Sequence, residues 1–430
     1  MKKLRKYVNR IGISNLAMII ALLMTPVSLS RETYDSGGSI LGSGNLVRVI
    51  FAGIALGIAF LKWKNGYVLY KPSAASVFLG IYWIFGIVSL LNTNWFSYSL
   101  FKIIEYGVLI STIIILLKIQ NKRKDNIFKD AFEIALLFSK IMLVIVVFGF
   151  ILSPTKALHV PGNDYSSLND AILPFQLQGW IIPLSNTAVC FYACFNMVGA
   201  FIDYFENNKH KVRSILCCLA YLFVAIVSLS RMALLASVVA IVFYVYVLND
   251  NKKIKIIISV IALVFVLFLG GLILAFLLRG QSEEEIISVT GRTKWWIYAI
   301  NVFNDGSFAE KVFGFGFAAG EKKVARESSA LMYTLDSDFF ANLISCGIAG
   351  FSAILLVIIS SIIQISRAVL YCKRNCRFQE DRITLAKCSC IMIIVMLRLF
   401  TVTTFSLLTF YLIIFIFASN AINVLMKRVK

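Results

Sequence analysis

Long apolar runs follow one another along almost the whole chain and constrain its fold more than any other feature. A helix crosses the hydrocarbon part of a bilayer with about 20 apolar residues, and many runs here reach that length. Apolar residues make up 59% of the chain and charged residues only 15%, whereas a soluble domain carries about 25% charged residues. Backbone groups in lipid must be paired within their own segment, which favours helices for continuous runs. We therefore expect an all-α, polytopic integral membrane protein.

The apolar runs predict about twelve transmembrane helices within a single transmembrane domain, residues 1–430. The expected spans lie near residues 11–30, 45–62, 73–92, 98–118, 132–152, 177–203, 213–229, 232–249, 254–278, 337–365, 385–407 and 408–426. No small-residue cleavage site closes the first run, so we interpret it as an uncleaved helix rather than a signal peptide.

Lysine and arginine residues gather in alternate loops, and this asymmetry predicts the orientation. The basic segments are residues 2–10, 62–71, 118–129, 209–213, 252–255, 367–387 and 427–430. Short basic loops stay in the cytoplasm, so we expect both termini there. The net charge of +20 then reflects topology, and we expect a lipid bilayer around the chain and no nucleic-acid partner.

Two polar intervals lie on the side opposite the basic loops. Residues 153–176 form a loop rich in turn residues, and residues 279–336 form a long external loop. Within the long loop, residues 287–303 predict an amphipathic helix on the membrane surface, with Trp295 and Trp296 at the interface. We expect this loop to cover the helix bundle from outside and to supply reactive groups.

Several basic residues fall in the outer half of the expected bundle. Arg231 lies between two spans, Arg279 ends a span, and Arg398 lies within one. Ionised side chains among membrane helices are costly and generally face a cavity or a partner. Arg231 is also placed to cap helix ends, and Lys102 to pair with Glu105 one turn away. The guanidinium group donates paired hydrogen bonds to phosphate, so the basic residues favour a large anionic membrane ligand, or else passage of an anion.

Two carboxylates, Asp336 and Asp338, stand where the chain re-enters an apolar run. Either is placed to act as a general base, and an Asp at a helix start is also an ordinary N-cap. No cluster of carboxylates or histidines indicates a metal site, so we expect neither a metal nor a cofactor.

Three motifs on the expected outer side resemble the superfamily of O-antigen polymerases and O-antigen ligases, which are bacterial envelope glycosyltransferases. The resemblance covers residues 213–351. Its motifs are Ser228-Leu229-Ser230-Arg231; Gly291-Arg292 with Trp295 or Trp296 and then Gly314-Phe315-Gly316; and Asp336-Ser337-Asp338-Phe339-Phe340 followed by Leu343, Gly347 and Gly350.

The resemblance implies a GT-C-like bundle in the bacterial cytoplasmic membrane and an inverting, metal-independent glycosyl transfer on its outer face. The donor would be an oligosaccharide linked to undecaprenyl diphosphate, and a chain-length regulator and a flippase would be partners. It implies the following roles: Arg231 and Arg292, with Arg398, hold the diphosphate; Asp336 or Asp338 is the base; Ser230, Arg279, Gly314 and Gly316 contact the substrate.

One departure from the ligase pattern decides between a polymerase and a ligase in our prediction. Ligases of the superfamily usually carry His where this chain has Asp336, and an acidic residue is common there among polymerases. We therefore predict a polymerase of repeat units for O-antigen or capsule. The alternatives are a ligase that transfers finished glycan, a transporter or flippase of an anionic or lipid-linked solute, and a membrane scaffold without catalysis.

Overall fold

The computed structural model describes residues 71–122, 126–159, 175–206, 211–249, 292–327, 335–374 and 379–427, with single positions between 50 and 57 and between 252 and 260. The chain divides into two compact units. The first comprises Met1–Leu136, Lys294–Ala368 and Val395–Lys430, and the second comprises Leu137–Thr293 and Val369–Ile394. Helices α7, α14, α17 and α18 contribute residues to both units.

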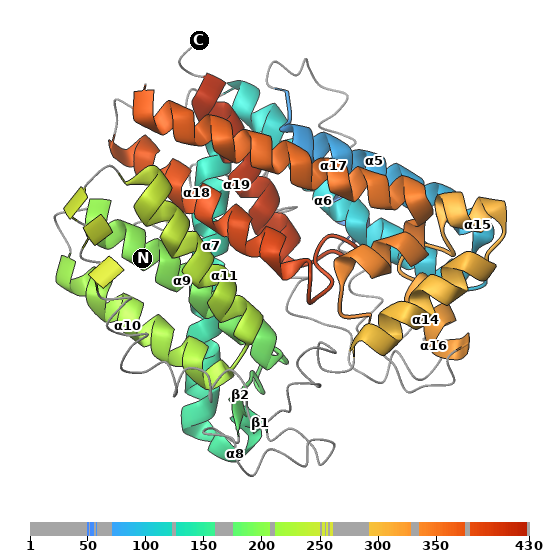
Figure 1. Ribbon diagram of the computed structural model, residues 1–430, viewed down its shortest axis with the longest axis horizontal. Helices are drawn as coiled ribbons and strands as arrows, with labels where there is room; N and C mark the ends of the chain where they lie inside the picture. Colours follow the sequence, from blue (N-terminus) through green and yellow to red (C-terminus); the bar gives the residue numbers. More distant parts are fainter. Residues whose placement is uncertain are drawn as a thin grey trace. The chain divides into compact units, whose positions relative to one another are not determined.

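The first unit is built from helices of very different lengths. They are α5 (Ala74–Val88) with the 3-10 turn η2 (Ser89–Asn92), α6 (Phe96–Lys122), the start of α7 (Ile127–Leu152), α14 (Arg292–Asp305), α15 (Phe308–Phe313), α16 (Gly320–Glu327), most of α17 (Asp338–Arg374), the end of α18 (Gln379–Arg398) and α19 (Phe410–Lys427). Figure 1 shows α17 running along α5, with the shorter α14, α15 and α16 grouped beside one end of it.

Helix α19 forms the core of the first unit. Nearly every residue from Phe410 to Leu425 is buried, because the segment is apolar on all sides. Polar side chains of neighbouring segments bind the backbone of α19. Asn126 Nδ2 donates to the carbonyl of Ala421 at 3.0 Å, and Gln364 Nε2 donates to the carbonyl of Ser419 at 2.6 Å. Such interhelical bonds hold helices together where water does not compete.

The second unit combines a helical bundle with a small β-hairpin. Its elements are the end of α7, α8 (Pro154–Ala157), β1 (Leu158–His159), β2 (Gln176–Leu177), α9 (Asn186–Glu206), α10 (Lys211–Ser228), α11 (Arg231–Phe243), a π-helical turn (Tyr244–Leu248) and most of α18. The strands pair antiparallel with Leu158 opposite Leu177, and α9 packs against both α10 and α11 (Figure 1). Lys387 and Asp203 form an ion pair at 2.8 Å that joins α18 to α9.

Eight helices within the described residues are long and apolar enough to cross a membrane, which confirms the all-α, polytopic prediction. They are Ala74–Asn92, Phe96–Gln120, Ile127–Leu152, Asn186–Glu206, Lys211–Ser228, Arg231–Leu248, Asp338–Lys373 and Phe410–Lys427. Each overlaps an expected span. The expected span 11–30 and most of the spans 45–62 and 254–278 lie outside the described residues, so the count of about twelve stays a prediction.

The expected span 385–407 differs from the structure at its C-terminal end. Helix α18 ends at Arg398, and residues 399–409 form an irregular turn. This stretch contains only apolar, serine and threonine residues, with no glycine, proline, asparagine or aspartate to indicate a turn. The turn is stabilised by side chains described below.

Candidate functional site

The re-entry segment begins with a buried carboxylate. Asp338 is the first residue of α17 and its side chain is fully buried. Its carboxylate accepts hydrogen bonds from the backbone N–H groups of Phe405 and Ser406, the latter at 3.1 Å. Its own N–H donates to the carbonyl of Leu399 at 2.9 Å. Hydrogen bonds to an ionised acceptor are about twice as strong as neutral ones, so Asp338 holds the 399–406 turn against the start of α17.

A buried arginine holds the same turn from within. Arg398 is only 5% exposed, and its Nη1 donates to the carbonyl of Thr403 at 2.9 Å and to the hydroxyl of Thr404. Its guanidinium carbon lies 3.7 Å from the centroid of the Tyr411 ring, in a cation–π arrangement. The bonds observed for Arg398 therefore go to its own segment of the chain rather than into an open basin.

Asp336 stands two residues before α17 in a different setting. It is half-buried and has a backbone φ of 42°, in the left-handed region. Only a few per cent of residues other than glycine adopt this region, and such outliers concentrate at functional sites. Asp336 therefore has a left-handed backbone conformation, whereas the helical conformation of α17 begins at Asp338.

Helix α14 packs onto the re-entry segment through a tryptophan. Trp296 Nε1 donates to the carbonyl of Leu335 at 3.2 Å, and its ring stacks on Phe340 with centroids 5.1 Å apart and planes 17° apart. The expected helix at 287–303 is thus present as α14, and Trp296 contacts protein. Arg292 is the first residue of α14, one helical turn before Trp296; its side chain lies outside the described residues.

The segment with Gly314 and Gly316 is bound to a break in α17. The N–H groups of Phe315 and Gly316 donate to the carbonyls of Ile344 and Ser345 at 2.9 and 3.2 Å. A Cβ atom on Gly314 would lie 2.3 Å from the Ser345 oxygen, and Gly347, at the break, has φ of 65°. Glycine here allows two backbones to touch. We expected the backbone at Gly314 and Gly316 to approach a substrate closely, and in the structure this backbone approaches α17.

Two lysines, Lys102 of α6 and Lys322 of α16, lie near aromatic and acidic side chains of α6. Lys102 Nζ lies 2.8 Å from the Glu105 carboxylate in a buried pair, which confirms the structural interpretation of that lysine. Lys322 Nζ lies 3.8 Å from the centroid of the Tyr98 ring. Burial and, secondarily, the charge of Lys102 lower the pKa of Lys322 below that of an ordinary lysine.

Sequence reasoning did not select Lys322 as a site residue. The signal it offered was a run of charged residues, Glu321-Lys322-Lys323, inside the long polar interval. Such runs are usually solvated surface, and nothing local indicates that Tyr98, far back in the chain, lies beneath Lys322.

The Ser-Arg turn lies in the second unit. Arg231 is the first residue of α11, Ser230 precedes it in an extended conformation, and Leu229 has φ of 53°. Asn186 supports this turn by donating to the carbonyl of Ser228 at 3.4 Å. A cation at a helix N-terminus is opposed by the helix dipole, so the dipole does not explain an arginine at this position.

The structure therefore brings five of the expected site residues into one unit: Asp336, Asp338, Gly314, Gly316 and Arg398. Ser230, Arg231 and Arg292 belong to the other unit, and Arg279 lies outside the described residues. The gathering of Arg231, Arg292 and Asp336 around one headgroup stays a prediction. Among the described residues, no group of three or more His, Cys, Asp or Glu side chains is placed to hold a metal ion.

Comparison with known families bears on this set of motifs. Residues 216–355 match the family model described as O-antigen ligase. This part of the chain is therefore similar to that family. The match begins in α10, includes the Ser-Arg turn, α14 and the glycine segment, and ends in α17. Among curated proteins, no sequence matches the chain. Together with the apolar helices, this similarity points to a membrane enzyme that processes glycans.

Proposed function

We propose that the protein polymerises oligosaccharide repeat units linked to undecaprenyl diphosphate, on the outer face of the bacterial cytoplasmic membrane. The observation that carries the proposal is the pair of aspartates at the re-entry segment. Asp338 is fully engaged in holding the 399–406 turn, whereas Asp336 is half-buried in a left-handed conformation beside it. In this proposal Asp338 builds the site, and Asp336 is the carboxylate that reacts.

In the proposed reaction, a sugar hydroxyl of one repeat unit attacks the anomeric carbon of a lipid-linked chain from the face opposite the phosphate. The bond from that carbon to the phosphate oxygen breaks, and the diphosphate leaves with the electron pair. Asp336 accepts the hydroxyl proton, and a general base of this kind contributes about 10²–10⁴-fold in rate. Configuration at the anomeric carbon inverts because a single displacement occurs.

Guanidinium groups stabilise the departing diphosphate. Arg231 and Arg292 bear this role in the proposal, with Ser230 and Arg279 as further contacts, because fixed cations stabilise charge that grows in the transition state. Asp338 and Arg398 position the turn instead of touching the substrate. No divalent metal is required, since the arginines supply the positive charge.

The test uses purified protein, a lipid-linked repeat unit and a gel readout of polymer length, with a chelator present. Arg231→Ala, Arg292→Ala and Asp336→Asn should each slow polymerisation about 10²-fold or more while remaining monodisperse in detergent. Arg213→Ala, which removes an exposed cation from the first turn of α10, at the end expected to be cytoplasmic, is the control and should polymerise normally. Full activity of Asp336→Asn, or a strict requirement for divalent metal, would contradict the mechanism.

A ligase is the second candidate, and the description of the matched family favours it. Asp336 in place of the His usual in ligases favours the polymerase. A deletion strain separates the two functions: loss of a polymerase leaves single repeat units on the acceptor, and loss of a ligase leaves long glycan unattached to it.

A further inference from the structure

A polar pocket lies between α5, α17 and α19, all within the first unit. Its volume is about 270 Å³, close to the lower limit of small-ligand sites. It is lined by Ser73, Ala74, Ser360, Ile363, Gln364, Arg367, Asn423 and Met426. The lining residues on α17 lie C-terminal to the Gly347 break, whereas Asp338 lies N-terminal to it. The proposed reaction uses none of them.

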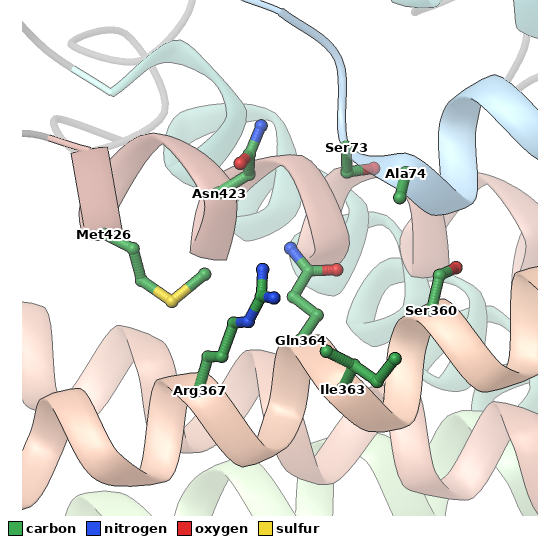
Figure 2. A pocket seen from close by; sticks show the side chains of 8 residues that line it. All are labelled: Ser73, Ala74, Ser360, Ile363, Gln364, Arg367, Asn423 and Met426. Atoms are coloured by element: carbon green, nitrogen blue, oxygen red, sulfur yellow. The ribbon is translucent and has the colours of Figure 1, made fainter.

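Arg367 provides the charge in this pocket. Figure 2 shows its side chain reaching from α17 toward α19, with the guanidinium group near Gln364 and facing Asn423 and Met426. Among the residues that the structure describes, no carboxylate pairs with Arg367. An arginine on a membrane helix is costly unless it meets a partner or a polar surface, so the pocket favours an anionic occupant.

The start of α5 adds positive potential on the other side. Ala74, the first residue of this helix, lines the pocket, and Ser73 is its N-cap. The hydroxyl of Ser73 accepts from the N–H of Ser76, while helix geometry leaves the first N–H groups directed outward from the helix end. The N-terminus of a helix attracts phosphate for this reason, and here it acts together with Arg367.

Hydrogen bonds between the three helices fix the walls of the pocket. The N–H of Ser73 donates to Asn420 Oδ1 at 2.9 Å, and the hydroxyl of Ser419 donates to Gln364 Oε1 at 2.7 Å. Asn423 Nδ2 donates to the carbonyl of Lys71 at 3.0 Å, which places the backbone of this basic residue beside the pocket. A pocket whose walls are already ordered binds its ligand with little further loss of entropy.

The surroundings favour a lipid over a soluble anion. Arg367 lies in the last turns of the candidate span Asp338–Lys373, at the end where the basic loops predict the cytoplasmic leaflet. Beside it, Ile363 is 46% exposed and Ile359 and Ile362 are each 52% exposed, as suits a surface against acyl chains. Basic pockets between transmembrane helices on this side of a membrane bind anionic headgroups.

We propose that this pocket binds the phosphate of an anionic membrane lipid. The guanidinium group of Arg367 and the N-terminal turn of α5 hold the phosphate, and an acyl chain lies along Ile363 and Met426. The site is separate from the residues assigned to glycosyl transfer, so its test does not depend on the proposed reaction.

The test is native mass spectrometry of the full chain in detergent, titrated with dioleoyl phosphatidylglycerol or with dioleoyl phosphatidylcholine, which has the same chains and no net charge. Two variants address the site: Arg367→Ala removes the cation, and Ser360→Leu fills the pocket but keeps the charge. Lys373→Ala is the matched control, since it removes an exposed cation from the same helix outside the pocket.

The wild-type protein should retain phosphatidylglycerol in preference to phosphatidylcholine. Arg367→Ala should weaken phosphatidylglycerol binding about tenfold, as expected for loss of a charge-assisted contact. Ser360→Leu should weaken it by a similar factor because the added side chain occupies the pocket, and Lys373→Ala should bind as the wild type does. Equal losses in Arg367→Ala and Lys373→Ala would overturn the proposal, because surface charge would then explain binding. Displacement of the lipid by millimolar inorganic phosphate would overturn the choice of a lipid.

Discussion

Two arginines in the first unit, Arg398 and Arg367, occupy opposite settings. Arg398 is buried, binds the carbonyl of Thr403 and the hydroxyl of Thr404, and stacks on Tyr411. Arg367 is exposed at a pocket, and no carboxylate in the described part of the chain pairs with it. This difference shows that an arginine among membrane helices indicates a ligand only when its guanidinium N–H groups remain accessible. Arg398 serves the fold, and Arg367 is the better indicator of a binding site.

The largest effect should come from the carboxylate that shares the turn with Arg398. Asp338→Ala leaves two buried N–H groups, those of Phe405 and Ser406, without their acceptor, so we expect a loss of about 3 kcal/mol or more in the free energy of unfolding. The measurement is thermal unfolding in detergent. Asp336→Asn, two residues away and half-buried, is the control and should change stability by about 0.5 kcal/mol or less. Equal unfolding temperatures would show that Asp338 does not hold the turn.

A middle-sized effect should separate the two arginines directly. Lysine cannot reproduce the planar fork or its stacking, so Arg398→Lys should destabilise the protein by about 1–3 kcal/mol. Arg367→Lys should change stability by about 0.5 kcal/mol or less, because the side chain is exposed. Both variants are compared by thermal unfolding in the same detergent. If Arg367→Lys proved as destabilising as Arg398→Lys, the contrast between the two arginines would be lost.

The smallest effect concerns a third cation, Lys322, which is held over the Tyr98 ring. Burial and the charge of Lys102 lower its pKa in the folded protein. Its charged form therefore costs stability below that lowered pKa, and the cost disappears as pH rises toward the ordinary lysine value. Lys322→Met should raise the unfolding temperature slightly at neutral pH, and the gain should shrink at alkaline pH. A gain that is independent of pH would contradict this assignment.

The sequence predicted well what depends on local patterns. Apolar runs placed the eight described spans, and the three-residue spacing of Lys102 and Glu105 predicted their pair, because neighbours on one helix face meet whatever the rest of the fold does. The end of α18 was not predicted, since it depends on bonds from Asp338, which is distant in the chain. The position of Lys322 over Tyr98 has the same non-local origin, and so has the contact of Gly314 with α17.

That contact between the Gly314 segment and α17 has a consequence for the way a substrate would enter in the proposed reaction. Two backbone hydrogen bonds join residues 315–316 to residues 344–345, just before the break at Gly347. Lifting the outer segment away would displace residues 338–346 with it, and Asp336 stands directly before them. Under the proposed function, we therefore expect a repeat unit to enter beside this segment while the segment stays bound to α17.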